Sequence, residues 1–407
     1  MSKQVVVVGA GQAGAALVAK LRALGHEGQI TLVGTDPLPP YQRPPLSKKY
    51  LLGELDAERL LLKPTSFYAD NNISTRFGTP VDAIDRGQKQ IVMGRDRIDY
   101  DCLALTTGAR VHRLPSRIGG DLAGVFAIRD VGDVDRLRPE VVVGRRALVV
   151  GGGYIGLEAA AVLANKGVVV TLIEMAERIL GRVASPETAA FFRALHTRQG
   201  VVLHEGVGLQ VLRGHEGRVS SAELSDGTDL AVDFVVAGIG ITPETTLAER
   251  AGLRIDNGIA VDETCRTSDP SIFAAGDCAS FPSQGGRLRL ESVQNAIDQA
   301  EHAAAAMLGS SEPYAPEPWF WSDQYDCKLQ IAGLNTGYDQ TVTRPGLRAG
   351  GQSVWYYRDG TFIAVDAMND PRAYMQGKRW LAEGITPDPD RIADATEDLK
   401  ALGIRED

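Results

Sequence analysis

Two glycine-rich motifs, each placed between a valine-rich run and an amphipathic stretch, most restrict the folds open to this chain. The first is Gly9-x-Gly11-x-x-Gly14, within QVVVVGAGQAG. In a strand–turn–helix unit, the first glycine permits a tight turn, the second lets the backbone approach a pyrophosphate, and the third lets the helix pack on the strand. Amides at the start of the helix then face the phosphates. The motif therefore predicts a dinucleotide-binding βαβ unit.

The second motif, Gly151-x-Gly153-x-x-Gly156, repeats this arrangement after RRALVV. The strand that follows the helix, VTLIE, ends in Glu174. A carboxylate at this position accepts hydrogen bonds from a ribose 2′-hydroxyl and repels a 2′-phosphate. Met175 and Ala176 supply no cation for such a phosphate. The second unit is therefore predicted to bind NADH rather than NADPH.

The acid of the first unit is displaced along the chain. Its strand, ITLVG, ends in Gly34, and the first carboxylate is Asp36, to which we assign the ribose, with a backbone group as the alternative. Further on, SIFAAGDCAS places Asp277 after Gly276 at a strand end, where the carboxylate can meet a ribitol hydroxyl. After two dinucleotide motifs, this dipeptide predicts FAD, bound by a domain that the NAD-binding domain interrupts.

The predicted fold class is α/β, with two Rossmann-like dinucleotide-binding domains and an α+β C-terminal domain. We assign residues 1–112 and 245–317 to a discontinuous FAD-binding domain, 113–244 to the NAD-binding domain, and 318–407 to the C-terminal domain. Prolines at 313, 316 and 318 mark the last boundary. Strand-like alternation follows to about Ala367, and the remainder is predicted to be helical or loose.

Bulk composition excludes several other classes of protein. A chain of 407 residues can bury substantial cores without a disulfide or metal. Its net charge of −9 argues against sequence-independent binding of nucleic acid. The run Val5–Val8 is too short for a signal peptide, and no run approaches the ~18 apolar residues of a membrane span. We therefore predict a cytoplasmic protein without membrane or nucleic-acid partners.

The cysteines and histidines indicate neither a metal site nor thiol chemistry. The four cysteines and six histidines show no metal-ligand spacing. Disulfide reductases with two dinucleotide domains need a cysteine pair near the early helix of the first domain, and NADH peroxidases or oxidases need one cysteine there. The stretch from Tyr41 to Leu61 has none, and no histidine follows His302. We therefore predict no metal, and a flavin that holds the hydride and passes it on.

Eight segments together resemble the ferredoxin reductases of bacterial oxygenase systems, of the putidaredoxin reductase and biphenyl dioxygenase reductase-component type. The resemblance extends from Val5 to about Met375, in YQRPPLSK, TTGAR, GGGYIGLE, TLIEMAERIL, GIGITPE, SIFAAGDCAS, RLESVQNAIDQA and PWFWSDQY. It implies a glutathione-reductase-like architecture. It also implies that NADH reduces FAD, which passes single electrons to a [2Fe-2S] ferredoxin feeding a haem monooxygenase or a Rieske dioxygenase.

Three alternatives remain open at this point. An NADH:rubredoxin reductase and a monodehydroascorbate reductase share the layout. A redox-sensing flavoprotein like apoptosis-inducing factor would use the same cofactors to change its binding to a partner. The oligomeric state is left as a monomer or a weak dimer.

The resemblance assigns residues to the two cofactors and to the reaction. In addition to the glycines and acids above, it assigns to FAD Arg43, Lys48, Val81, Arg129, Asp277, Val293 and Trp321. The NAD site comprises Gly151, Gly153, Ile155, Gly156, Glu158, Glu174 and Gly240. Lys48, Glu158 and Trp321 are the catalytic candidates near the reactive edge of the flavin.

Elementary physical chemistry supports these assignments. Glu158 follows Gly156 by two positions, on the first helical turn, where nicotinamide would enter. A Lys48–Glu158 pair would neutralise itself and respond to the changing charge of the flavin, while an ordinary salt bridge between domains is the alternative. ESVQNA is predicted to begin a helix whose N-terminal end stabilises negative charge on the flavin. Trp319 and Phe320 are assigned to core packing.

Overall fold

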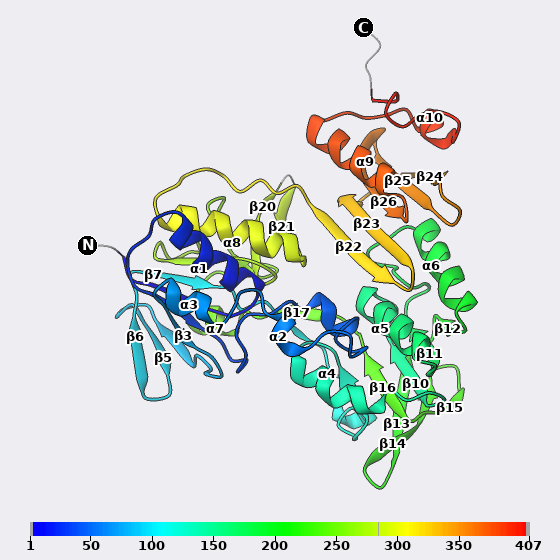
Figure 1. The fold of residues 1–407 in the computed structure, drawn as a ribbon, viewed down its shortest axis with the longest axis horizontal. Helices are drawn as coiled ribbons and strands as arrows, with labels where there is room; N and C mark the ends of the chain where they lie inside the picture. Colours follow the sequence, from blue (N-terminus) through cyan, green and yellow to red (C-terminus); the bar gives the residue numbers. More distant parts are fainter. Residues whose placement is uncertain (1–2, 284, 404–407) are drawn as a thin grey trace. The chain divides into compact units, whose positions relative to one another are not determined.

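The computed structural model describes residues 3–283 and 285–403 and divides into two compact units (Figure 1). Unit 1 contains the chain up to Arg43 together with Ala57–Arg110 and Ile241–Pro316. Unit 2 contains Pro44–Asp56, Val111–Gly240 and the chain from Glu317 onward. Positions 1–2 and 404–407, where the predicted domains begin and end, lie outside the described residues.

Unit 1 is built on a five-stranded parallel sheet. Its strand order is β19 (Ile272–Ala274), β7 (Cys102–Leu105), β1 (Val5–Val8), β2 (Ile30–Val33) and β3 (Ile73–Arg76). Every residue of β1, β2 and β7 is buried, as expected of parallel strands covered on both faces. The predicted βαβ unit is confirmed, and β19 is the predicted return of the chain to the first domain.

Two helices cover one face of this sheet, and a small meander covers the other (Figure 1). Helices α1 (Gln12–Ala23) and α8 (Val293–Met307) pack together there, with Leu17 and Ala300 fully buried. The opposite face packs against β4 (Ala83–Asp85), β5 (Gln90–Met93) and β6 (Asp96–Asp99). The smaller elements associated with this unit are α2 (Ala57–Leu60), α3 (Ser66–Asp70), β8 (Ala109–Val111), β17 (Ile241–Pro243), α7 (Thr246–Arg250), β18 (Ile259–Ala260), β20 (Ala279–Ser283) and β21 (Gly286–Leu288).

Unit 2 contains a second five-stranded parallel sheet. Its order is β12 (Val202–Glu205), β11 (Val169–Glu174), β10 (Arg146–Val150), β16 (Phe234–Ala237) and β9 (Val125–Ala127). One face packs against β13 (Leu209–His215), β14 (Arg218–Leu224) and β15 (Asp229–Ala231). Helices α5 (Tyr154–Asn165) and α6 (Pro186–Arg198) pack against strands of the same sheet.

Short helices complete this part of unit 2. They are η1 (Pro44–Ser47), η2 (Ser116–Ile118), α4 (Val131–Leu137) and η3 (Arg138–Glu140). At η1, Pro44 and Pro45 begin a 3₁₀ turn and no regular α-helix forms, as the two prolines predict.

The rest of unit 2 is an antiparallel sheet covered by helices. Its order is β22 (Trp319–Gln324), β23 (Cys327–Gly333), β26 (Thr361–Met368), β25 (Gln352–Arg358) and β24 (Gln340–Pro345). Helices α9 (Pro371–Glu383) and α10 (Pro389–Ala393) follow, and Trp355 and Trp380 form the centre of this core. The predicted strand-rich segment with a helical end is confirmed.

Candidate active site

The turn between β1 and α1 has the geometry that its three glycines predict. Gly9 adopts φ +117°, and a Cβ there would lie 2.1 Å from the carbonyl oxygen of Thr106. A Cβ on Gly14 would lie 2.0 Å from the oxygen of Gly9. Gly11, in contrast, has nothing within 4 Å of its Cβ position. Any larger residue would therefore clash at the first and third positions. At the second position, the space beside the backbone is open and fits a pyrophosphate.

The turn between β10 and α5 repeats this geometry inside unit 2. Gly151 adopts φ +106°, with its Cβ position 2.4 Å from the oxygen of Gly238. The Cβ position of Gly156 lies 2.0 Å from the oxygen of Gly151, and that of Gly153 is open. Each unit thus holds one glycine-rich turn, which we call a cradle: the first comprises residues 9–14 and the second residues 151–156. Each lies at the carboxyl end of a central parallel strand, where dinucleotides bind in such sheets.

Two buried polar residues that sequence reasoning did not single out support the first cradle. Thr106 Oγ1 donates to the carbonyl of Gly9 at 2.8 Å. Gln299 Oε1 accepts from the amide of Gly276 at 2.8 Å and is fully buried on α8. The TTGAR segment was a usable signal for Thr106, because it follows a buried strand that pairs with β1.

Asp36 lies past the end of β2, as the sequence indicates, and its carboxylate closes its own loop. Oδ1 accepts from the amide of Leu38 at 3.1 Å, and Oδ2 accepts from the hydroxyl of Tyr41 at 2.6 Å. The displacement has a steric cause, because a Cβ on Gly34 would lie 2.5 Å from the Cβ of Ala10. The strand therefore ends in a glycine, and the first carboxylate comes two residues later.

Asp277 and the start of α8 lie beside the first cradle. Gly276 adopts φ +82°, and its Cβ position is 3.2 Å from Ala13 on α1 and 3.7 Å from Ala296 on α8. The ESVQNA segment does begin a helix, since Val293 is its first residue and Ser292 Oγ accepts from the amide of Asn295 at 3.1 Å. The structure therefore brings the glycine turn, Asp277 and Val293 together within unit 1.

The other residues of unit 1 assigned to FAD have less distinctive surroundings. Val81 is half-buried against the core under the sheet. The Arg43 guanidinium lies 5.3 Å from the ring centroid of Tyr41.

Arg287, Arg289 and Lys328 flank motifs of the flavin domain, and the sequence alone allows either a cationic rim that docks an acidic ferredoxin or scattered surface charge. Arg287 donates to the carbonyl of Val261 at 2.7 Å, and Arg289 donates to the carbonyl of Asp277 at 3.1 Å. Their side chains are only 19% and 12% exposed. The rim hypothesis is therefore wrong for this pair, while Lys328 on β23 is exposed.

Glu174 lies against the second cradle. Its Oε2 accepts from the amide of Gly152 at 2.7 Å, and its Oε1 accepts from the amide of Ala176 at 2.8 Å. The carboxylate therefore stands between the glycine turn and the loop after β11. Both oxygens retain accepting capacity for a ribose hydroxyl, since a carboxylate has about four lone-pair directions.

Neighbouring positions complete the surroundings of this cradle. Ile155, on the first turn of α5, is 47% exposed, so its apolar side chain is open to contact with a ligand. Gly240 adopts φ +101°, and its Cβ position lies 3.5 Å from His112 and 3.7 Å from Arg182. Arg129, assigned to FAD, is half-buried before α4, and its amide donates to Asp133 at 3.1 Å.

A second acid at this edge was not predicted. Glu205 ends β12 opposite Glu174, accepts from the amide of Ile179 at 2.8 Å and pairs with Arg193 at 2.6 Å. Burial alone would raise the pKa of Glu205, but hydrogen bonds from Arg193 and Ile179 outweigh it and the pKa is lowered. Glu205 therefore anchors the loop that follows Glu174.

Lys48 and Glu158 form the predicted ion pair inside unit 2. Lys48 Nζ lies 3.1 Å from Glu158 Oε1, and the two side chains are 17% and 9% exposed. Two serines add donors to the carboxylate, with Ser47 Oγ 2.9 Å from Oε2 and Ser322 Oγ 2.7 Å from Oε1. Asp323, which the sequence did not single out, lies 3.3 Å from Lys48 Nζ. The cluster therefore has two carboxylates and one ammonium.

The aromatic run on β22 divides between its two faces. Trp319 and Trp321 lie on one face with ring centroids 5.4 Å apart, and Trp319 packs on the C-terminal core as predicted. Phe320, on the other face, packs against the ring of Tyr154 on the first turn of α5, with the ring centroids 4.8 Å apart. Trp321 is partly exposed.

The thiols are poorly suited to redox chemistry. All four cysteines are free and buried. Burial raises the pKa of each thiol, at Cys102, Cys265, Cys278 and Cys327, which disfavours the reactive thiolate. Among residues 3–283 and 285–403, no cluster of three or more metal-ligating side chains occurs. Nor does any helix there have the length and apolar character to cross a membrane.

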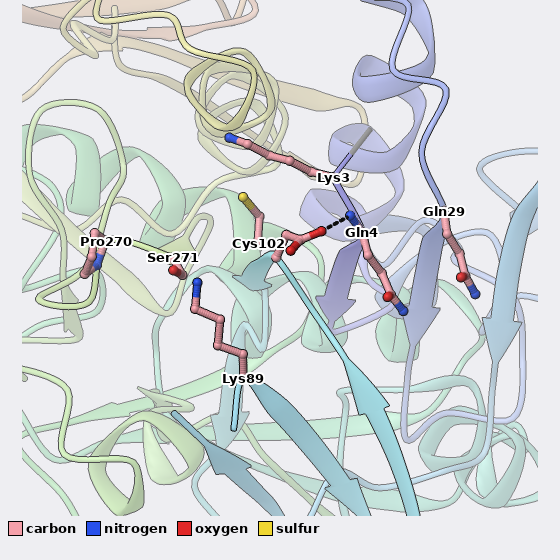
Figure 2. A pocket seen from close by; sticks show the side chains of 8 residues that line it. Lys3, Gln4, Gln29, Lys89, Cys102, Pro270 and Ser271 are labelled. Atoms are coloured by element: carbon pink, nitrogen blue, oxygen red, sulfur yellow. Dashed lines mark hydrogen bonds between the residues drawn. The ribbon is translucent and has the colours of Figure 1, made fainter. Parts of the chain in front are cut away.

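A concavity in unit 1 lies at the opposite ends of the strands from the glycine turn. Lys3, Gln4, Lys89 and Cys102 are among the residues that line it (Figure 2). Asp101 also lines it, and its Oδ2 accepts from the amide of Gln4 at 2.7 Å. Because ligands of parallel sheets bind at the carboxyl ends of the strands, this amino-terminal concavity is not assigned to a cofactor.

Comparison with known proteins identifies the family. Residues 3–300 match the family described as pyridine nucleotide-disulphide oxidoreductase, and residues 319–403 match that described as reductase C-terminal. This chain belongs to the pyridine nucleotide-disulphide oxidoreductases. The match confirms the predicted α/β fold class, the oxidoreductase activity and the use of FAD and NAD(H).

Several relatives resemble the chain over nearly its whole length. Rhodocoxin reductase of Rhodococcus erythropolis is 41% identical over 399 residues, which cover 97% of this chain and 93% of that protein. Rubredoxin-NAD(+) reductase of Pseudomonas putida is 38% identical over 372 residues, covering 90% of this chain and 96% of that protein. The reductase in the crystal structure of the covalent putidaredoxin reductase–putidaredoxin complex superimposes with a TM-score of 0.95 at 39% identity, covering 98% of both chains. The predicted resemblance to bacterial ferredoxin reductases is confirmed.

Proposed function

We propose that this chain is a ferredoxin–NAD(+) reductase, in which FAD accepts hydride from NADH and delivers single electrons to a [2Fe-2S] ferredoxin that serves a haem monooxygenase or a Rieske dioxygenase. The observation that carries the proposal is the combination of two glycine cradles with thiols that are all buried. Two dinucleotides can bind, but no reactive thiol is available to receive the electrons. A one-electron protein acceptor is therefore the most economical destination.

The residues of unit 1 would bind and orient FAD. Gly9, Gly11 and Gly14 would bring backbone amides to the pyrophosphate, and Asp277 would accept from the ribitol. Asp36 would accept from the adenine ribose through its remaining lone pairs. The positive end of α8 at Val293 would stabilise charge on the ring, and Arg43 and Val81 would contact the same ligand.

The residues of unit 2 would bind NADH and position it. Gly151, Gly153 and Gly156 would bind the pyrophosphate, Glu174 the ribose, and Ile155 and Gly240 the remaining surface of the nucleotide. Lys48 and Glu158 would hold a fixed charge pair near the reacting ring atoms, in a site where few water molecules screen it. Trp321 would stack beside the flavin, and Arg129 would contact it.

The domain limits predicted from the sequence carry this assignment. We propose that residues 1–112 and 245–317 form the FAD-binding domain, residues 113–244 the NAD-binding domain, and residues 318–407 the C-terminal domain. A cytoplasmic location is proposed because four unpaired thiols are typical of a reducing compartment. We propose a monomer or a weak dimer, which light scattering across a concentration series would distinguish.

The test is NADH-dependent reduction of cytochrome c with and without a purified [2Fe-2S] ferredoxin. If the proposal is correct, the ferredoxin accelerates the reaction strongly and NADPH supports it poorly. An unchanged rate with a panel of such ferredoxins would refute it. Because the relative from Pseudomonas putida is named for rubredoxin, rubredoxin is the second acceptor to assay, and its preference over ferredoxin would favour that alternative.

A redox-sensing role, as in proteins like apoptosis-inducing factor, predicts a different result. Flavin reduced by NADH would then persist in air, and neither small iron–sulfur protein would reoxidise it quickly. Stopped-flow measurement of flavin reoxidation separates this outcome from both reductase alternatives.

A further inference from the structure

A row of hydrogen-bonded side chains extends from Glu158 into the interior of unit 2. Ser322 Oγ donates to Glu158 Oε1 at 2.7 Å. Gln324 Nε2 in turn donates to Ser322 Oγ at 3.3 Å. Ser322 and Gln324 are both fully buried and, being two positions apart on β22, project from the same face of the strand.

The row continues to α6 and ends at Tyr325. His196 Nε2 lies 2.8 Å from Gln324 Oε1, and Tyr325 lies 3.2 Å from His196 Nδ1 through its hydroxyl. An amide oxygen can only accept, so Nε2 carries the proton and Nδ1 accepts from the Tyr325 hydroxyl. Burial lowers the pKa of His196 and raises that of Tyr325, which favours this neutral imidazole and protonated phenol.

Every donor in the row therefore points toward Glu158. The order is Tyr325 hydroxyl, His196 Nε2–H, Gln324 amide and Ser322 hydroxyl, and it ends on a carboxylate. A carboxylate oxygen is a strong acceptor, and hydrogen bonds to charged groups are the shorter and stronger ones. Because Ser322, Gln324 and His196 are fully buried, reversing one donor among them would leave another buried polar atom without a partner. The direction of the row is thereby fixed.

The same face of β22 packs on the helix that carries the second cradle. Phe320 contacts Tyr154 on the first turn of α5, and Ser322 contacts Glu158 one turn later. Glu158 Oε2 accepts from Ser47, while Oε1 receives Ser322 and Lys48. The carboxylate cannot rotate without breaking hydrogen bonds to both of its oxygens. Its fixed orientation in turn fixes the position of the Lys48 ammonium.

We propose that Ser322, Gln324 and His196 are positioning residues for hydride transfer, which hold the carboxylate of Glu158 in one orientation toward Lys48. The proposal rests on the proposed function, because it assumes that the Lys48–Glu158 pair acts near the reacting rings. Ser322 acts on Glu158 directly, Gln324 acts through Ser322, and His196 acts through Gln324. None of the three needs to touch a cofactor.

The first experiment tests the hydrogen bonds of the row by NMR, without measuring enzyme activity. The holoenzyme is labelled with ¹⁵N in the histidine rings, and the signal of His196 is assigned by its loss in His196→Asn. We expect a neutral ring protonated at Nε2 near neutral pH. Ser322→Ala should shift this signal, although Ser322 and His196 are joined only through Gln324. A ring protonated at Nδ1, or a signal unmoved by Ser322→Ala, would overturn the proposal.

The second experiment measures how fast NADH bleaches the bound flavin at saturating NADH, before any protein acceptor is added. We expect Ser322→Ala to slow bleaching by about tenfold, since one donor to a charged group is lost. Gln324→Glu keeps the volume and the acceptor for His196, but it replaces the donor to Ser322 with a second carboxylate oxygen. It should slow bleaching by about threefold. The Ser322→Ala/Gln324→Glu double variant should be no slower than Ser322→Ala, because Gln324 has no other route to Glu158.

Ser353→Ala is the matched control. Ser353 lies in the same sheet, is equally buried, and uses its hydroxyl to accept from Trp355 Nε1 at 3.0 Å. It should lower the melting temperature about as much as Ser322→Ala and leave bleaching unchanged. A wild-type bleaching rate in both Ser322→Ala and Gln324→Glu would overturn the proposal, as would multiplying effects in the double variant.

Failure of the proposed function gives a distinct pattern. If the wild type does not reduce ferredoxin, the proposed electron acceptor is wrong. The rate at which NADH bleaches the flavin still tests whether the row positions Glu158. If Glu158→Gln bleaches as fast as the wild type, both the role of Glu158 and the positioning row are refuted. A slow Glu158→Gln beside wild-type rates in Ser322→Ala and Gln324→Glu refutes the row alone.

Discussion

The ammonium of Lys48 lies 3.1 Å from Oε1 of Glu158, with only 9% of the glutamate side chain exposed. A pair this buried costs desolvation that its mutual attraction only partly offsets, unless further hydrogen bonds satisfy both ions. Ser47 and Ser322 supply those bonds to Glu158, and Asp323 supplies a second carboxylate to Lys48. Several polar residues thus hold the Lys48–Glu158 pair in place, an arrangement that is typical of reaction sites.

Replacing the lysine tests this arrangement. Lys48→Met keeps the length of the side chain but leaves Glu158 and Asp323 without their shared cation. We expect bleaching of the flavin by NADH to slow by about tenfold or more, because a positioned charge is lost. Lys49→Met, at the exposed neighbouring position, is the control. Equal rates for both variants in stopped flow would mean that the pair is an ordinary salt bridge.

Glu174 should control the choice between the two nicotinamide nucleotides. Glu174→Ala removes the acceptor for the ribose and the negative charge that repels a 2′-phosphate. The ratio of kcat/KM for NADH to that for NADPH should fall by about tenfold, the expected effect of one hydrogen bond to a charged group. Glu177→Ala, in the exposed part of the same loop, should leave the ratio unchanged. If Glu174→Ala also keeps the wild-type ratio, the ribose assignment is wrong.

The sequence predicted the parts of the site that depend on local chain geometry. Gly9 and Gly151 adopt positive φ, and Gly14 and Gly156 meet backbone oxygens at distances that no Cβ tolerates. Positive φ angles and close backbone contacts require three glycines at fixed spacing, so the turn can be predicted without a structure. Glu174 was equally readable, because it ends the apolar run VTLIE that follows the second glycine motif and its helix.

The parts that the sequence did not reveal depend on contacts between distant segments. Thr106, directly after β7, and Gln299 on α8 support the first cradle. The TTGAR segment was a signal for Thr106, but the sequence showed neither the contact of Thr106 with Gly9 nor that of Gln299 with Gly276. Arg289 looked like a surface cation, yet its guanidinium binds the carbonyl of Asp277. Lys48 and Glu158 could be paired only through the family resemblance, and Asp323 became visible only when β22 was placed beside them.

Asp366 should make the stability of the fold depend on pH. Burial raises its pKa to about 6. Oδ2 accepts from Thr188 at 2.8 Å and from Tyr356, while Oδ1 has no hydrogen-bond partner among the described residues. An unfolded aspartate titrates near ~3.9, so between about pH 4 and pH 6 the folded state retains a proton that the unfolded state has lost. Its contribution to the free energy of unfolding therefore falls as pH rises through this window, by up to about 3 kcal/mol.

Asp366→Asn removes this titration and isolates the effect from the other acids. Relative to the wild type, we expect the variant to gain stability steadily from about pH 4 to about pH 6 and to stay level above that. The measurement is the melting temperature of the two proteins across the pH range, with the exposed Asp326→Asn as control. A difference between Asp366→Asn and the wild type that stays constant with pH would show that Asp366 is ionised in the folded protein throughout.

The second cradle offers a comparison between two glycines of one motif. The Cβ position of Gly153 is open and its φ is −79°, so Gly153→Ala should fold with nearly the melting temperature of the wild type. Its methyl group would occupy the space where a pyrophosphate approaches, and we expect the Kd for NADH to rise by about tenfold or more. Gly156→Ala, whose Cβ would lie 2.0 Å from the oxygen of Gly151, should instead lower stability by about 1–3 kcal/mol. The dependence of the flavin bleaching rate on NADH concentration in stopped flow gives the Kd, and thermal unfolding gives the stability, so the two measurements separate the two effects. A Gly153→Ala protein that binds NADH as the wild type does would mean that the turn between β10 and α5 is not where the nucleotide binds.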